Sequence, residues 1–591
     1  MPYGNTPLHN ATDRKGNIAI VKLLISSGAD VNAKNYLGVV PLYQAASYGE
    51  NVEVVKFLVS EGADIQVSNG QGVTPLHVAV YSANDIEIIK FLIANGADVN
   101  AKDKNGASPL CRAVGVEDEI VEFLVNAGAS VNIQDHYGTT PLYCVVQSTN
   151  DVNTIKFLAS KGADIRVKDM YENMLLHSAA KYNKNIEIIK YLVSEGLDVN
   201  AKNKVGSTPL HWAAYGNKNI QIFKFLISQG NVNVKNNRDE TLLHSASSGE
   251  NVEVVQFLVS EGVNVNAKDK DGNTPLHSAA ADNYNIIEVA KFLVSNGADI
   301  NAKNKNGNTP LHLAARENKN VEVVKFLASE GADINAKNID GSSPLHMAVS
   351  SYQNVDVAKF LVSEGADINA IGKDGATPLH VAARWANDIE IVKFLIFNGA
   401  DVNARDEENF TPFHWAIRWN KNDDVAKFFI SEGVDVNAKV MYDITPLHWA
   451  ARDNENVEVV RFFVSNGADV NAKAMYGFTP LHWAVINNYN VEITKVLISA
   501  GADVTAKISD ASPHCAGYTP LHLAAGGCHL DAIQFLVAEG ADVNAKNKAG
   551  ITPLHAVVLG NNDVEVIKFL VSNGADITAK DEDGKTPFDY N

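Results

Sequence analysis

The 591-residue chain has few cysteines and no long apolar run. Four cysteines in so long a chain give no disulfide framework, which favours a reducing compartment. No apolar run approaches the ~20 residues that a membrane helix needs, so we expect no membrane insertion. Residue 1 leads directly into MPYGNTPLHN, without a basic and apolar leader. We therefore expect a soluble cytoplasmic protein, and export to a host cell by a route without a cleaved leader stays open.

Positive charge is also scarce. The chain has 50 Lys and Arg against 69 Asp and Glu, which gives a formal net charge of −19. A general affinity for phosphate backbones needs clustered positive charge that releases counterions. The composition therefore excludes such an affinity, and we expect no nucleic-acid partner.

Internal repetition is what the chain has in abundance. The tetrapeptide TPLH or a near copy begins at residues 6, 40, 74, 108, 140, 174, 208, 241, 274, 309, 343, 377, 411, 445, 479, 519 and 552, and a fragment TPFD begins at 586. Eleven of the seventeen steps between these starts are 34 residues long. A stack of small units grows along one axis and so escapes the size limit of a single hydrophobic core. We therefore predict one solenoid over residues 1–591, with about 17 repeats and a partial C-terminal unit.

The stretch GNTPLHLAARENKNVEVVKFLASEGADINAKNIDG, residues 307–341, shows the unit most clearly. Thr309 is a good N-cap and Pro310 suits the first helical position, so a short helix is predicted to begin there. The apolar residues of VEVVKFLASE predict a second helix, which Gly331 ends as a left-handed C-cap. The following ADINAKNIDG is too short for a helix and predicts a hairpin-like finger with a type I turn. The fold class is therefore all-α.

The recurrence of TPLHxAA, VVKFL and GADVNA resembles the ankyrin repeat, and this resemblance covers the whole chain. It implies an ankyrin-repeat solenoid of helix-loop-helix units with projecting β-hairpin-like fingers. Fourteen of the 17 histidines occupy the fourth position of TPLH. The resemblance gives them a structural role, in which they hydrogen-bond backbone groups at the helix start and between repeats.

Two His-Cys pairs contain the residue types of a zinc site. His514 and Cys515 lie in the insertion ISDASPHCAG, residues 508–517, which lengthens the finger before Thr519 by six residues. Cys528 and His529 come about nine residues, or ~13 Å, further along the helix that begins at Thr519. This spacing fits no common zinc pattern. We expect a flexible loop there, with no metal ion, and no cofactor in the chain.

No nucleophile with a base, no phosphate-binding glycine loop and no carboxylate pair stands out from the repeat. A catalytic site is a unique constellation of residues, and this chain offers repetition instead. We therefore predict that the protein is not an enzyme. The favoured function is a monomeric scaffold that binds segments of other proteins along the concave groove of first helices and fingers. The alternative is the repeat region of a host-directed effector or toxin-like protein.

Tryptophan is unevenly distributed, because five of the six lie between residues 385 and 483. With the threonine of TPLH as position 1, positions 3, 6 and 7 of the first helix face the core, and positions 5, 8 and 9 lie on nearly the opposite side. Four successive units fill the second set with aromatic residues and arginine: Arg384, Trp385, Trp415, Arg418, Trp419, Trp449, Arg452 and Trp483. The fingers before these helices add Phe410, Met441, Tyr442, Met475, Tyr476 and Phe478 in place of the usual KNKNGN.

These residues predict a partner-binding segment at residues 384–483, since interface centres are enriched in Trp, Tyr, Met and Arg. The arginines at 384, 418 and 452 repeat in register, so we expect a row of spaced cations with tryptophan faces alongside. A tryptophan at position 5 can also pack between adjacent first helices. That structural role is the alternative for each of Trp212, Trp415, Trp449 and Trp483 taken singly.

Overall fold

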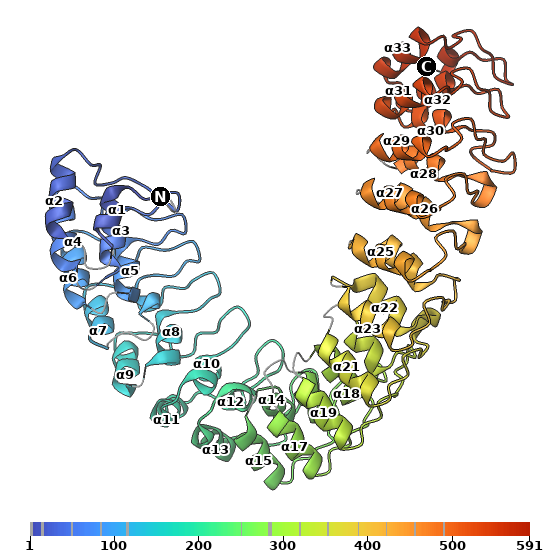
Figure 1. Cartoon of the computed structure of the whole chain (residues 1–591). Coiled ribbons are helices and arrows are strands. Elements are labelled where there is room, and N and C mark those ends of the chain that lie inside the picture. The colour runs from blue at the N-terminus through green and yellow to red at the C-terminus, as the bar shows by residue number, and fades with distance from the viewer. Residues whose placement is uncertain are drawn as a thin grey trace. The chain divides into compact units, whose positions relative to one another are not determined.

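The computed structural model consists of pairs of short helices, each pair followed by a projecting finger (Figure 1). It describes residues 4–13, 17–48, 51–82, 85–113, 118–149, 151–249, 251–281, 287–317, 321–350, 354–387, 389–420, 422–453, 457–487 and 491–590. Its contacts divide the chain into two units, Met1–Lys305 and Asn306–Asn591, and each unit is described by itself.

The first unit contains the helices α1 (Pro7–Ala11), α2 (Ile18–Ser26), α3 (Pro41–Ala46), α4 (Val52–Ser60), α5 (Pro75–Ser82), α6 (Ile86–Ala94), η3 (Leu110–Arg112), α7 (Asp118–Asn126), α8 (Pro141–Ser148), α9 (Val152–Ser160), α10 (Leu175–Tyr182), α11 (Ile186–Ser194), α12 (Pro209–Gly216), α13 (Ile220–Gln229), α14 (Leu242–Ser248), α15 (Val252–Ser260), α16 (Pro275–Ala281) and α17 (Ile287–Ser295).

The second unit contains α18 (Pro310–Glu317), α19 (Val321–Ser329), α20 (Pro344–Ala348), α21 (Val355–Ser363), η4 (Lys373–Gly375), α22 (Pro378–Trp385), α23 (Glu390–Phe397), α24 (Pro412–Trp419), α25 (Asp423–Ser431), η5 (Met441–Asp443), α26 (Pro446–Asp453), α27 (Val457–Ser465), η6 (Met475–Gly477), α28 (Pro480–Asn487), α29 (Val491–Ser499), α30 (Pro520–Gly526), α31 (Leu530–Ala538), α32 (Pro553–Leu559), α33 (Val564–Ser572) and η7 (Pro587–Tyr590).

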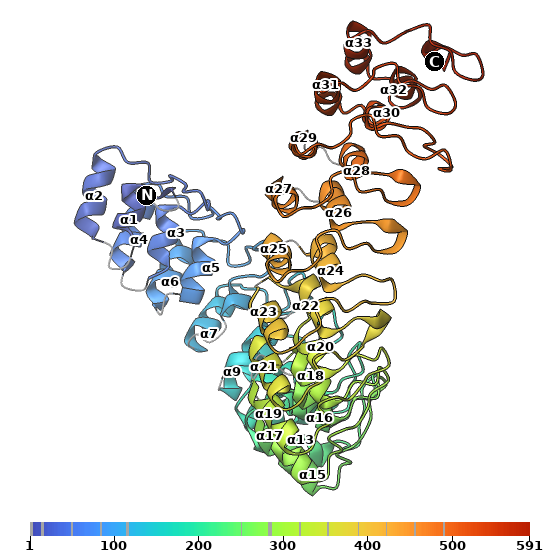
Figure 2. The same ribbon diagram turned by 45° about the vertical axis from the view of Figure 1, so that its right-hand side comes forward.

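Each unit has two layers of helices (Figures 1 and 2). The first helices of successive repeats pack on one another, as α10, α12, α14 and α16 do in the first unit and α26 and α28 do in the second. The second helices pack behind them, and the fingers project from the edge that the first helices form. Among the described residues there is no β-strand, and two fingers contain single bridges, Lys168–Met174 and Lys235–Thr241. The all-α prediction is therefore confirmed.

None of the helices in the described part of the chain has the length and apolar character that would let it span a bilayer.

The TPLH histidine links most repeats to the next one. In α18 the backbone N–H of Thr309 donates to His312 Nδ1 at 3.1 Å, and His312 Nε2 lies 3.0 Å from the carbonyl oxygen of Ser342 in the next finger. One ring nitrogen therefore accepts a hydrogen bond and the other donates one, which requires a neutral imidazole. All fourteen histidines of this position are buried. Their predicted structural role is confirmed except at His482, whose Nε2 is buried without a hydrogen-bond partner among the described residues.

Three repeats of the first unit carry another residue at this position: Tyr43, Cys111 and Tyr143. The hydroxyl of Tyr43 accepts from the Asn69 amide at 3.4 Å, and that of Tyr143 donates to Asp169 Oδ2 at 3.3 Å. Both tyrosines therefore still reach the following finger. Cys111 has no ring that could do so.

The repeat that contains Cys111 also departs from the predicted helix. The sequence predicts an α-helix from Ser108, whereas the structure has only the single turn η3 there. This repeat is two residues shorter than the neighbouring repeats of 34 residues. The chain must therefore enter α7 sooner. Residues 114–117 lie outside the described residues.

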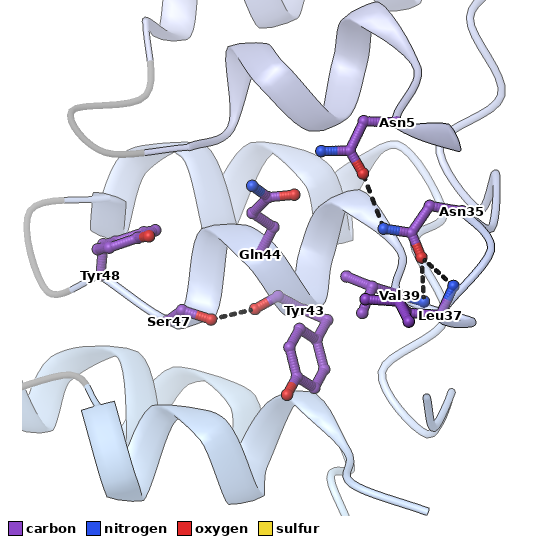
Figure 3. Close-up of a pocket in the computed structure, with 8 residues that line it drawn as sticks. All are labelled: Asn5, Asn35, Leu37, Val39, Tyr43, Gln44, Ser47 and Tyr48. Atoms are coloured by element: carbon purple, nitrogen blue, oxygen red, sulfur yellow. Dashed lines mark hydrogen bonds between the residues drawn. The ribbon is translucent and has the colours of Figure 1, made fainter. Parts of the chain in front are cut away.

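An Asn or Asp at the start of the turn holds most fingers in shape. Figure 3 shows Asn35, whose Oδ1 accepts from the backbone N–H of Leu37 at 2.9 Å and of Val39 at 3.0 Å. Its own amide donates to Asn5 of the preceding finger at 2.7 Å. Gly38 supplies the positive φ of 73° that closes the turn. The side chain thus stabilises the turn and joins it to its neighbour.

Four fingers of the second unit lack this Asn or Asp and have in its place Gly372, Val440, Ala474 and Ile508. The turns that follow Gly372, Val440 and Ala474 have two consecutive residues with positive φ, as in a type I′ turn. In one of them φ is 67° at Tyr442 and 57° at Asp443, and in another it is 58° at Tyr476 and 78° at Gly477. A left-handed non-glycine residue costs ~1–3 kcal/mol. The two tyrosine fingers of the predicted binding segment are therefore strained, and the predicted type I turn does not describe them.

Candidate protein-binding surface

The predicted binding residues lie on α22, α24, α26, α28 and the fingers that precede three of these helices (Figure 2). The exposed ones are Trp385 (46% exposed), Trp419 (37%), Met441 (44%), Tyr442 (57%), Met475 (40%) and Arg452. The half-buried ones are Arg384, Trp415, Arg418, Tyr476, Phe478 and Trp483. Phe410 and Trp449 are buried. The exposed and half-buried side chains form a surface, and the two buried side chains support it.

Each arginine lies between a tryptophan ring of its own repeat and a tryptophan ring of the next repeat. The guanidinium carbon of Arg384 lies 4.8 Å from the ring centre of Trp385 and 5.1 Å from that of Trp419. Arg418 lies between Trp419 at 4.6 Å and Trp449 at 4.5 Å. Each cation–π contact at a partly exposed site contributes ~0.5–1 kcal/mol. The structure therefore orders the cations against flat aromatic faces.

The third arginine continues the pattern. Arg452 lies 5.7 Å from the ring centre of Trp449 and 5.6 Å from that of Trp483. The two indoles meet edge to face at 5.2 Å. The sequence places these arginines in register, but the interleaving across repeats is visible only in the structure.

The charge of the first two arginines is not neutralised locally. In the described part of the chain, no carboxylate lies within 4 Å of Arg384 or Arg418. Lysines on the second helices differ, as Lys393 shows by pairing with Glu390 at 3.1 Å. In an acidic protein, two unneutralised guanidinium groups are available to an acidic group of a partner.

A small core supports this surface. Phe410, Val440 and Trp449 are only 4%, 6% and 6% exposed, and they pack together. Around them lie Trp415, Ile417, Ile444 and Trp483. Phe410 and Trp449 therefore support the exposed rings from below and present no face of their own. For Trp449 the packing role between first helices is the one observed.

The two central indole N–H groups differ in their partners. Trp415 Nε1 donates to Asp406 Oδ2 at 2.8 Å. Trp449 Nε1 is buried and has no hydrogen-bond partner among the described residues. The sequence explains this difference. The residue nine positions before Trp415 is Asp406, whereas the residue nine positions before Trp449 is Val440. A buried donor without an acceptor costs ~1–3 kcal/mol.

We expect Val440→Asp to stabilise the protein by ~1–2 kcal/mol. The new carboxylate would accept from Trp449 as Asp406 accepts from Trp415, and would also cap its own turn. Urea unfolding followed by circular dichroism measures the gain. The control repeats the substitution in a Trp449→Phe background, where the gain should shrink. Equal effects in both backgrounds would contradict the explanation.

The other candidate ligands do not form a site. Across the described ranges, no three His, Cys, Asp or Glu side chains gather as metal ligands. His529 Nδ1 instead lies 2.8 Å from the carbonyl oxygen of Val485. The insertion at residues 508–517 returns to the finger through a bond from Ile508 N–H to the Tyr518 carbonyl at 2.9 Å.

Two thiols of adjacent repeats contact each other. A hydrogen bond from Cys144 lowers the pKa of the Cys111 thiol to about 7. The same contact, followed by burial, raises the pKa of Cys144. Because Cys111 is only 5% exposed, we assign this pair to packing and to no binding site.

A related cluster in the first unit has no counterpart among the sequence predictions. Lys181 occupies position 8 of α10, and its Nζ lies 5.4 Å from the ring centre of Trp212, at position 5 of α12. Arg384 and Trp415 stand in the same register at 5.8 Å. A search for a cation at position 8 followed by tryptophan at position 5 of the next repeat would have found the cluster.

The comparison with known families agrees with this architecture. A family profile described as "Ankyrin repeats (3 copies)" matches residues 8–103, 76–169, 176–269, 216–304, 250–338, 281–372, 311–406, 345–440, 413–508 and 507–581. No curated protein matches the chain. Repeats of this kind generally mediate protein binding and are typically non-catalytic. Because the overlapping matches cover nearly all of residues 8–581, the chain belongs to the ankyrin repeat family.

Proposed function

We propose that the chain is a non-catalytic scaffold whose principal binding surface, at residues 384–483, holds a segment of another protein. The observation that carries this proposal is the alternation of Arg384 and Arg418 with exposed tryptophan faces, without a carboxylate nearby among the described residues. Folding alone does not require such a surface. An exposed aromatic patch of this kind is costly unless a partner covers it.

The chemistry of the surface defines the partner. Arginines prefer acidic groups, and the flat faces of Trp385 and Trp419 prefer apolar side chains. Exposed Met441 and Tyr442 at the finger tip extend the same surface. The tip has a left-handed backbone conformation, with a φ of 67° at Tyr442. The partner is therefore an extended or helical segment with acidic and apolar residues.

The test uses a photo-crosslinking amino acid at position 441 of the full chain, expressed in its native cell. Its matched control is position 339, which has the same place in an earlier finger and is 70% exposed as isoleucine. We expect a distinct protein adduct from position 441 and none from position 339. Equal adducts from both positions, or a nucleic-acid adduct, would contradict the proposal.

A further inference from the structure

The first unit contains a hollow built around a single lysine. The cavity measures about 350 Å³ and is lined by Lys181, Ser207, His211, Trp212, Tyr215 and Ser245. These residues come from the neighbouring first helices α10, α12 and α14 and from the end of one finger. We refer to it as the lysine pocket.

Aromatic rings surround the ammonium group of this pocket. Lys181 Nζ lies 4.9 Å from the ring centre of Tyr182, 4.9 Å from that of Tyr215 and 5.4 Å from that of Trp212. Gly216 makes room for the lysine, because a Cβ there would lie 2.9 Å from Lys181 Cγ. The lysine is therefore held in a defined position.

The remaining lining groups carry no carboxylate, and several of them can donate hydrogen bonds. Burial lowers the pKa of His211 to about 4, so this ring is uncharged at neutral pH. Ser207, Ser245 and the Trp212 indole supply hydroxyl and N–H donors. No carboxylate lines the cavity, and none lies within 4 Å of Lys181 in the described residues. The pocket thus has one positive charge and several donors.

We propose that the lysine pocket binds the carboxylate of an Asp or Glu side chain in a protein segment that crosses α10 and α12. A cationic group is disfavoured, because Lys181 already occupies the aromatic faces and would repel it. A carboxylate would face the ammonium and the donors around it.

The surroundings of the pocket favour a polypeptide over a small anion. Tyr182 and Tyr215 are 47% and 39% exposed at its rim. The fingers that lead into α10 and α12 carry exposed Tyr171 and Val205 (55% and 57%). Apolar side chains on either side of the acidic residue can cover these groups. The acidic residue would then set the position of the segment.

The test uses the full chain labelled with ¹⁵N, in which each of the six tryptophan indoles has one N–H group, and Trp212→Phe assigns the signal of interest. The probes are the blocked peptides acetyl-Leu-Glu-Leu-amide, its Gln and Lys analogues, and inorganic phosphate. We expect a saturable shift of the Trp212 signal with the Glu peptide, and at least about tenfold weaker binding of the Gln and Lys peptides.

Two variants locate the binding group. Lys181→Met keeps the aliphatic stem and should weaken the Glu peptide at least about tenfold, whereas the exposed Lys184→Met should not. Gly216→Ala should also weaken binding, because its methyl group displaces Lys181 without removing the charge. Thermal unfolding verifies that all three remain folded.

Several outcomes would overturn the proposal. One is that the Gln peptide binds as tightly as the Glu peptide. Another is that folded Lys181→Met or Gly216→Ala binds the Glu peptide as tightly as the unmodified chain does. The third is that phosphate alone shifts the Trp212 signal. None of them bears on the surface at residues 384–483, because Trp212 lies in the first unit and reports only on the lysine pocket.

Discussion

Lowering the pH from 7 to 4 is expected to unfold the protein, with most of the stability lost between pH 6.5 and 4. The cause is the buried TPLH histidine. Burial lowers the pKa of His448 to about 4. The same value holds for His211, His346, His414, His482 and His522.

The sign follows from the protons bound in each state. An unfolded histidine has a pKa of ~6.5, so between pH 6.5 and 4 the unfolded chain binds more protons than the folded one. The stabilisation is complete above pH 6.5 and is lost as the pH falls to 4. Each of these histidines then contributes a loss on the order of 3 kcal/mol. Several such losses exceed the ~5–15 kcal/mol that a folded domain typically has.

Urea unfolding at half-unit steps of pH measures this effect. His448→Gln should be less stable at pH 7, because it loses a bridge between repeats. Its unfolding free energy should fall less steeply as the pH is lowered, since unfolding then takes up one proton fewer. The control His514→Gln changes an exposed residue of the insertion and should keep the original slope. Stability that is independent of pH between 7 and 4.5 would contradict the role assigned to the histidines.

The second large effect is expected from Arg418→Ala combined with Trp419→Ala. Arg418 lies over three rings, those of Phe410, Trp419 and Trp449, and Trp419 packs edge to face on Trp415 at 5.2 Å. Their loss should lower stability by only ~1–2 kcal/mol, since the contacts are partly exposed. Loss of a central anchor should weaken partner binding by ~2 kcal/mol or more, or about 30-fold.

The measurement compares thermal unfolding with binding of the protein trapped at position 441. The matched control is Arg316→Ala with Glu317→Ala, which changes positions 8 and 9 of α18, where the two side chains pair with each other at 2.6 Å. It should leave binding unchanged. A large loss of stability in the first variant with intact binding would show that its side chains serve repeat packing alone.

The helices and their ends are predictable because their determinants are local. Proline after a capping residue begins the first helix, and a glycine with positive φ, such as Gly331 at 93°, ends the second. The histidine bridge also repeats at a fixed spacing, so one unit explains the others. Features of this kind depend on a few neighbouring residues.

The binding surface is less predictable, because it depends on contacts between repeats. Trp415 and Trp449 occupy the same position of their helices, yet one is half-buried and the other buried. The difference arises from Asp406 against Val440 in the preceding fingers and from the rings of the next repeat. Helical geometry alone places position 5 on the exposed face, but the contacts between repeats bury it to different extents.

The histidine bridges also determine how the first unit would respond to a mechanical load. Every bridge ties a helix to the finger that follows, so tension along the stack passes from one repeat to its neighbour through these bonds. Tyr43 and Tyr143 replace the bridge with a hydroxyl bond to the following finger, whereas Cys111 reaches only the Cys144 thiol of the next repeat, and its first helix is only the turn η3. Under a pulling force we expect the first unit to open near residue 111, and the histidine-bridged repeats that follow Met174 to yield later.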